Sequence, residues 1–280
     1  MNFHISPFTY TGEVHLFVTD LERSLKFYTE VIGFNVLEQG PTSIILTADG
    51  TTPLLIIEQP EGVKPKESRK SGLYHFALLL PTRADLGKVL IHLSNCGIPL
   101  GASDHKVSEA LYLSDPDGNG IEIYCDRDPA EWEWGNGLVS MTTDPLDAQS
   151  IVAEVDGPWE GLPAGTVMGH IHLHVADVEE AEAFYRALGF ATVSHYPNAV
   201  FMSTGNYHHH IALNTWNGKG APQPSKNSAG LHSFTLIYPD DQTLNDAVNQ
   251  IRGLNKEVKQ AGSHYVTADP SGTGMILRLK

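Results

Sequence analysis

Histidines gather in two short stretches of the chain, and they are the first candidates for chemistry. Fourteen occur in 280 residues, with three in a row in YHHHIALN (207–214) and three more in GHIHLHV (169–175). Burying an imidazole without a partner is costly, whereas imidazole titrates near neutrality and is a common metal ligand. Both stretches otherwise resemble buried strands, so they favour a metal site or proton transfer over a histidine-rich edge strand without function.

The elements that carry these histidines belong to an internal repeat. Residues 12–34 (GEVHLFVTDLERSLKFYTEVIGF) match residues 169–190 (GHIHLHVADVEEAEAFYRALGF) with one deletion. Each copy opens with the alternation of a strand and continues into a helix that starts at an N-cap, Asp20 or Asp177. Glu180 completes a predicted capping box in the second copy, and a glycine ends each helix.

A second pair of stretches has a related pattern, GLYHFALLL at 72–80 and GLHSFTLIY at 230–238. Each is followed by a helical stretch and by a hairpin with a DPxG turn, a turn signal with a clear backbone mechanism. The whole chain therefore predicts an α+β fold of four βαβββ modules, at 10–60, 72–126, 168–217 and 230–280. In chain order these form an N-terminal pair (1–126), a linker rich in Trp, Pro, Gly and acids (127–166), and a C-terminal pair (167–280).

Composition and charge exclude several classes of partner. The formal net charge is −15 without any Lys/Arg-rich stripe, which argues against nucleic acid and anionic membranes. No apolar run approaches the roughly 20 residues of a membrane-spanning helix, and the N-terminus does not resemble a signal peptide. Two cysteines are too few for a disulfide framework, so we expect a cytoplasmic protein, and a homo-oligomer because these are common.

The four modules with these openings resemble the vicinal oxygen chelate superfamily, which includes glyoxalase I, bleomycin-resistance proteins and extradiol ring-cleaving dioxygenases. The resemblance covers nearly the whole chain, and it implies that modules pair into two curved-sheet, half-barrel domains that cup a metal. The stretch from His105 to Glu122 (HKVSEALYLSDPDGNGIE) is similar to the signature of extradiol enzymes of the catechol 2,3-dioxygenase type. The signature begins two residues before His105, and the sequence departs from it only there, at Ser103, where the pattern prefers Gly, Asn, Thr or an aliphatic residue.

This resemblance implies a ligand set of two imidazoles and one carboxylate around Fe(II), with Mn(II) as the alternative. Glu122 is implied as a ligand, with His75 on the first strand of the same module. Taken singly, a strand histidine is more often a core residue and a strand glutamate more often faces solvent. Together inside the signature they favour a metal site. His105 and Tyr112 are implied as catalytic residues beside the substrate.

The third ligand has two candidates, His172 and His15, at matching places in modules three and one. Extradiol enzymes also carry an acid/base histidine near a last strand, and only module three has histidines there. We therefore predict His172 as the ligand and His209 as the acid/base, with His208 the second choice. This assignment requires module two to pair with three, and one with four.

Other histidines are expected close to the same site. His208 and His174 are predicted to contact substrate, and His170 shares a strand face with His172 and His174, so it lines the pocket or supports a ligand. Module four has Ser233 and Ile276 in place of His75 and Glu122, so it cannot complete a ligand set.

The predicted function is insertion of O2 into a catechol-type aromatic diol beside its hydroxyls, in a pocket with mostly hydrophobic walls. One alternative is a glyoxalase-type lyase or isomerase, which prefers two carboxylates among its ligands. The other is a small-molecule binding protein of the bleomycin-resistance kind, which needs no ligand set. The sequence does not identify the catechol, or distinguish it from a hydroquinone.

Overall fold

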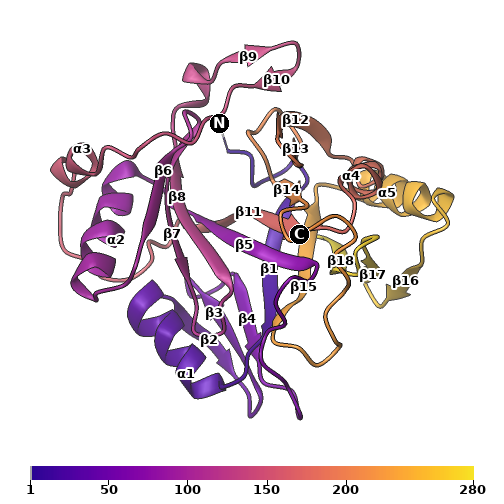
Figure 1. Cartoon of the computed structure of the whole chain (residues 1–280), viewed down its shortest axis with the longest axis horizontal. Coiled ribbons are helices and arrows are strands. Elements are labelled where there is room, and N and C mark those ends of the chain that lie inside the picture. The colour runs from indigo at the N-terminus through magenta and orange to yellow at the C-terminus, as the bar shows by residue number, and fades with distance from the viewer. Residues whose placement is uncertain (1) are drawn as a thin grey trace.

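The computed structural model describes residues 2–280 and arranges most of its strands in two curved eight-stranded sheets (Figure 1). One sheet has the strand order β16-β17-β18-β15-β1-β4-β3-β2, and the other β12-β13-β14-β11-β5-β8-β7-β6. Each sheet therefore combines one module from the N-terminal half with one from the C-terminal half. The pairing of module two with three and of one with four is confirmed, and the stretches 1–126 and 167–280 describe chain order rather than sheets.

All four modules follow the predicted βαβββ order. The first comprises β1 (Tyr10–Phe17), α1 (Leu21–Lys26), a π-helical turn (Phe27–Ile32), β2 (Asn35–Gln39), β3 (Ser43–Thr47) and β4 (Leu55–Glu58). The second comprises β5 (Gly72–Leu79), α2 (Arg83–Asn95), β6 (Gly101–Asp104), β7 (Ser108–Ser114) and β8 (Gly120–Asp126). The third comprises β11 (Val167–His174), α4 (Val178–Ala187), β12 (Ala191–Tyr196), β13 (Ala199–Ser203) and β14 (Ile211–Asn214). The fourth comprises β15 (Gly230–Tyr238), α5 (Asp241–Gly253), β16 (Val258–Ala261), β17 (His264–Ala268) and β18 (Gly274–Leu279).

The predicted helix signals are present in the first and third modules. Asp20 accepts a hydrogen bond from the Arg23 N–H, and Asp177 accepts from the N–H groups of residues 179 and 180. Gly33 ends the first helix with φ +91°, a conformation that glycine adopts without strain. The Glu180 side chain pairs with Lys256 Nζ at 3.1 Å. Only the aspartate half of the predicted capping box is therefore seen.

Buried tyrosines connect the two sheets through the DPxG turns. Tyr28 donates to Asp115 Oδ2 at 2.8 Å, joining module one to module two. Tyr185 donates to Asp269 Oδ2 at 3.2 Å and joins module three to module four in the same way. In both turns the aspartate also accepts backbone N–H groups of its own turn. Each tyrosine thus fixes the position of a hairpin that belongs to the other sheet.

The segment 127–166 has structure of its own. It contains a 3₁₀ turn (Pro129–Glu131), the hairpin of β9 (Trp134–Gly135) and β10 (Leu138–Val139), and α3 (Ala148–Ala153). The hairpin projects at the edge of the molecule, and α3 lies beside α2 (Figure 1). Among residues 2–280, no helix is long and apolar enough to cross a lipid bilayer.

Candidate metal centre and active-site cavity

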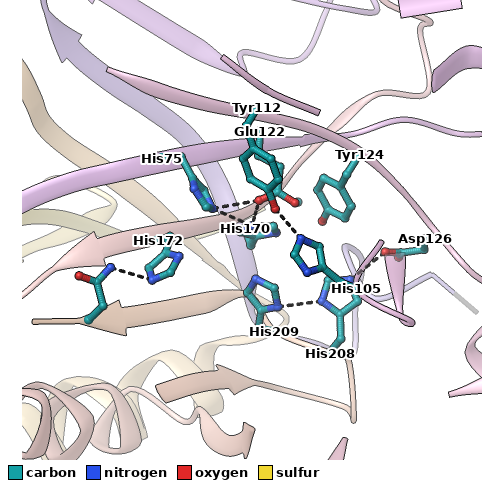
Figure 2. A network of polar contacts seen from close by, with 12 residues as sticks. His75, His105, Tyr112, Glu122, Tyr124, Asp126, His170, His172, His208 and His209 are labelled. Atoms are coloured by element: carbon teal, nitrogen blue, oxygen red, sulfur yellow. Dashed lines mark hydrogen bonds and ion pairs between the residues drawn. The ribbon is translucent and has the colours of Figure 1, made fainter. Parts of the chain in front are cut away.

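Three potential ligand atoms converge on the concave face of the sheet built from modules two and three. Glu122 Oε2 lies 3.0 Å from His75 Nε2 and 3.2 Å from His170 Nε2, and the two nitrogens are 3.3 Å apart. Within residues 2–280 these side chains form the one group of three that could hold a metal ion, and all are buried. Figure 2 shows them pointing at a common centre. Ligands at right angles around a metal with bonds of about 2.1 Å lie about 3.0 Å apart, so the spacing fits one face of a metal.

The register of three strands produces this convergence. Ala77 on β5 pairs with His170 on β11 at one side and with Glu122 on β8 at the other. His75 lies two residues earlier on β5 and therefore on the same face. Ala77 is fully buried, and its single methyl leaves the space above the sheet that the carboxylate and imidazole occupy.

Substituting Ala77 by leucine is expected to separate the ligands. The larger side chain would fill the space between His170 and Glu122, so metal affinity should fall by at least about tenfold, as for other changes around metal ligands. Overpacking should also cost about 1–3 kcal/mol of stability. Thr235→Leu is the matched control, because Thr235 pairs with Ile276 in the other sheet as Ala77 pairs with Glu122. Titration with metal and thermal melting of both variants test this, and unchanged metal binding in Ala77→Leu would contradict it.

The structure places His170, rather than the predicted His172, beside His75 and Glu122. Residue His172 is the direct cross-strand partner of His75, and its Nε2 accepts a hydrogen bond from Asn214 Nδ2 at 2.9 Å. The antiparallel pair β5/β11 is symmetric, and the position equivalent to His75 is His170, just as Ala77 is equivalent to His172. Alternation puts three β11 histidines on one face of the sheet. Only the register between β5 and β11 decides which of them lies beside His75 and Glu122.

Burial and mutual contact set the protonation of this group. Burial lowers the pKa of His170 to about 4, against the opposing effect of Glu122. Burial by itself raises the pKa of Glu122, but contacts with His170 and His75 outweigh it and hold that pKa well below its usual range. At neutral pH the group therefore has a carboxylate and a neutral His170, the protonation states that metal ligands require.

A cavity of about 390 Å³ is lined by His75 and Glu122, two of the three candidate ligands, whereas His170 is buried behind it. Glu122 is its only carboxylate among the described lining residues, and the hydrophobic walls predicted for an aromatic substrate are present. The apolar and aromatic lining consists of Tyr74, Val107, Tyr112, Met141, Tyr196, Phe201 and Trp216. The polar lining includes His75, His105, His172 and His209. His174 and His208, predicted to contact substrate, do not line this cavity.

His105 and Tyr112 form a fixed pair at the cavity wall. His105 Nδ1 lies 2.6 Å from the carbonyl oxygen of Thr142, which can only accept, so the proton is on Nδ1. If His105 carries that proton alone, its Nε2 accepts from the Tyr112 hydroxyl at 2.7 Å. Burial, followed by the charge of Glu122, raises the pKa of Tyr112 well above its usual value, so it stays a phenol. Its oxygen lone pairs remain free to accept a hydrogen bond from a substrate hydroxyl.

The consecutive histidines 208–210 point at three different neighbours. His210 is fully buried, and its Nε2 donates to the Phe3 carbonyl oxygen at 3.1 Å. His208 is also fully buried and contacts Asp126. Only His209 lines the cavity, with its ring centroid 4.1 Å from that of His170. Burial, with further contributions from neighbouring imidazoles, lowers the pKa of His209 well below its usual range.

The sheet built from modules one and four has no such ligand set. His15, the alternative ligand, lies there with its Nε2 2.9 Å from Glu58 Oε2. Ser233 and Gly274 pair as His75 and Gly120 do, which confirms that Ser233 and Ile276 occupy the positions of His75 and Glu122.

The chain belongs to the glyoxalase/bleomycin resistance protein/dioxygenase superfamily, whose model matches residues 8–123 and 167–272. A catechol-2,3-dioxygenase of Bacillus subtilis (strain 168) is 44% identical over 268 residues, covering 94% of each chain. Biphenyl-2,3-diol 1,2-dioxygenase 3 of Rhodococcus globerulus is 28% identical over 136 residues, which cover 48% of this chain and 67% of the relative. Among solved structures, glyoxalase I from Zea mays superposes with a TM-score of 0.58 at 18% identity, covering 96% and 92% of the two chains. That likeness concerns the fold.

Proposed function

We propose that the protein is an extradiol dioxygenase that binds Fe(II), or alternatively Mn(II), through His75, His170 and Glu122 and cleaves a catechol-type ring with O2. The observation that carries the proposal is the convergence of two imidazoles and one carboxylate, two of which, His75 and Glu122, line a cavity with aromatic walls. The extensive identity with a catechol-2,3-dioxygenase supports it. The single carboxylate at the cavity favours this chemistry over a glyoxalase-type reaction, which prefers two.

The residues of the chain have distinct roles in this proposal. When bound, the metal would supply acidification of the catechol hydroxyls and activation of O2. His209 accepts a proton from substrate and later returns it. The oxygen of Tyr112, oriented by His105, accepts a hydrogen bond from a substrate hydroxyl. The aromatic walls exclude water and stack on the ring.

An assay with paired variants tests both the reaction and the ligand set. The protein is loaded with Fe(II) without oxygen, catechol is added, air is admitted, and the yellow ring-cleavage product is followed. His170→Ala should lose both metal and colour, because it removes a ligand. His172→Ala should retain metal, because that imidazole contacts Asn214 instead. Retention of metal by His170→Ala together with its loss from His172→Ala would restore His172 as the ligand. Iron-loaded protein without any colour would refute catechol as the substrate.

A further inference from the structure

A line of hydrogen-bonding groups runs from the cavity into the protein behind His209. His209 Nδ1 lies 2.8 Å from His208 Nδ1, and His208 Nε2 lies 2.8 Å from Asp126 Oδ1. Figure 2 shows these three side chains in sequence, with His209 closest to the ligands. His208 is fully buried, so no water competes for its two nitrogens. Asp126 ends strand β8, four residues after Glu122 and on the same strand face.

The partners of each nitrogen determine where the protons are. A carboxylate only accepts hydrogen bonds, so His208 donates its Nε2–H to Asp126. If His208 carries that proton alone, its Nδ1 has a lone pair, and the 2.8 Å contact to His209 Nδ1 then requires His209 to donate. His209 is left with its proton on Nδ1 and a lone pair on Nε2. That Nε2 makes no hydrogen bond within residues 2–280 and is not fully enclosed.

We propose that Asp126 and His208 are positioning residues that fix His209 as the Nδ1–H tautomer, so that its basic Nε2 faces the substrate. The inference rests on the proposed function, in which His209 is the acid/base. Without the pair, either ring nitrogen of His209 could carry the proton, and the Nε2–H form could not accept one. A functional imidazole is commonly held in one orientation and one tautomer by a hydrogen-bond partner at the ring nitrogen that does not take part in the reaction.

An amide at position 126 would exchange donor and acceptor in both hydrogen bonds, the one between residues 126 and 208 and the one between His208 and His209. The NH2 group of asparagine can donate to His208 Nε2, which would move the His208 proton to Nδ1 and the His209 proton to Nε2. Replacing a carboxylate by an amide behind a catalytic histidine is known to select the wrong tautomer in serine proteases, with a loss of about 10⁴ in kcat. Asp126→Asn is therefore the informative variant, since it preserves shape.

Tyr207 provides the matched control. Its hydroxyl donates to the same Asp126 Oδ1 at 3.2 Å and is 2.7 Å from the Tyr124 hydroxyl. Tyr207→Phe removes a contact to Asp126 without touching the bond between Asp126 and His208. If Asp126 had only a structural role, Asp126→Asn and Tyr207→Phe should have similar kcat values. If it acts through the tautomer of His209, only Asp126→Asn should lower kcat.

The first test reads the tautomers directly and does not depend on turnover. The full chain is labelled with ¹⁵N in its histidine rings, and protonated and unprotonated ring nitrogens are distinguished by NMR in the metal-free protein. His209→Gln and His208→Gln assign the signals. We expect His209 to be protonated at Nδ1 in the unaltered chain and in Tyr207→Phe, and to shift toward Nε2–H in Asp126→Asn. Protonation of His209 at Nε2 in the unaltered chain, or an unchanged tautomer in Asp126→Asn, would overturn the proposal.

The second test is kinetic. In iron-loaded Asp126→Asn we expect kcat with catechol to fall at least about tenfold, within the roughly 10²–10⁴ range of acid/base catalysis, while KM and iron content stay within about twofold. The substitution should have no further effect in a His209→Ala background, because it acts through His209. An unchanged kcat in Asp126→Asn, when His209→Ala is impaired, would refute the positioning role. Full activity of His209→Ala would instead refute the acid/base function and leave the tautomer result standing.

Discussion

Glu122→Gln is expected to abolish metal retention and, with it, ring cleavage. The substitution keeps the shape of the side chain but removes the one anionic group from the proposed ligand set of His75, His170 and Glu122. Metal affinity should therefore fall by more than the roughly 10–100-fold seen when groups around metal ligands are changed. Metal content after anaerobic loading and dialysis measures this, alongside appearance of the yellow product.

Unfolding is not expected to explain this loss. His170 is neutral at neutral pH because burial lowers its pKa to about 4, so removing the carboxylate does not leave a charged His170 isolated in the interior. Burying a carboxylate is itself costly, and the melting temperature of the metal-free variant should be unchanged or raised. Glu58→Gln is the matched control, since Glu58 contacts a histidine in the other sheet without a third ligand. A Glu122→Gln protein that retains iron would contradict the ligand assignment.

His209→Ala is expected to retain iron but to lower kcat by about 10²–10⁴, the usual contribution of a positioned acid/base group. His209 is at the cavity wall and outside the group of three ligand atoms, so binding of metal should not depend on it. Anaerobic iron loading and steady-state kinetics with catechol separate the two effects.

His195→Ala is the control for this variant. His195 lines the same cavity from strand β12, and within residues 2–280 it forms no hydrogen bond or ion pair with the candidate ligands or with the line through His208. Its loss should change KM more than kcat. Equal kcat values for His209→Ala and the unaltered protein would remove the acid/base role from His209, and His208 could not replace it because it lies outside the cavity.

The sequence predicted the architecture well because local signals repeated. Asp20 and Asp177 mark two helix starts at matching places, and the DPxG turns mark two hairpins. The assignment of Ser233 and Ile276 to the positions equivalent to His75 and Glu122 followed from that repeat. Even the exchange of modules between sheets could be predicted, from which modules carried histidines.

The sequence could not separate His170 from His172. Period-two alternation puts both on one face, and the choice depends on which residue of β11 pairs with Ala77, a contact between strands far apart in the chain. A direct alignment of His75-Phe76-Ala77-Leu78 with the stretch 170–173 would have favoured His170. Asp126 could have been noticed as a further acid on the face of Glu122. No sequence pattern identifies Thr142 as the hydrogen-bond acceptor of His105, because every residue has a backbone carbonyl.

The exchange of modules also constrains how the chain can fold during its synthesis. Tyr10 in the first strand pairs with Ile237, near the other end of the chain. At typical translation rates of roughly 5–20 residues per second, about 11–45 s separate the emergence of these two partners. During that interval β1 lacks its neighbour at the centre of a sheet, and unpaired strands of this kind invite association with other chains. A chaperone would therefore be most useful while only the N-terminal half has been synthesised, because it would prevent β1 from associating with other chains.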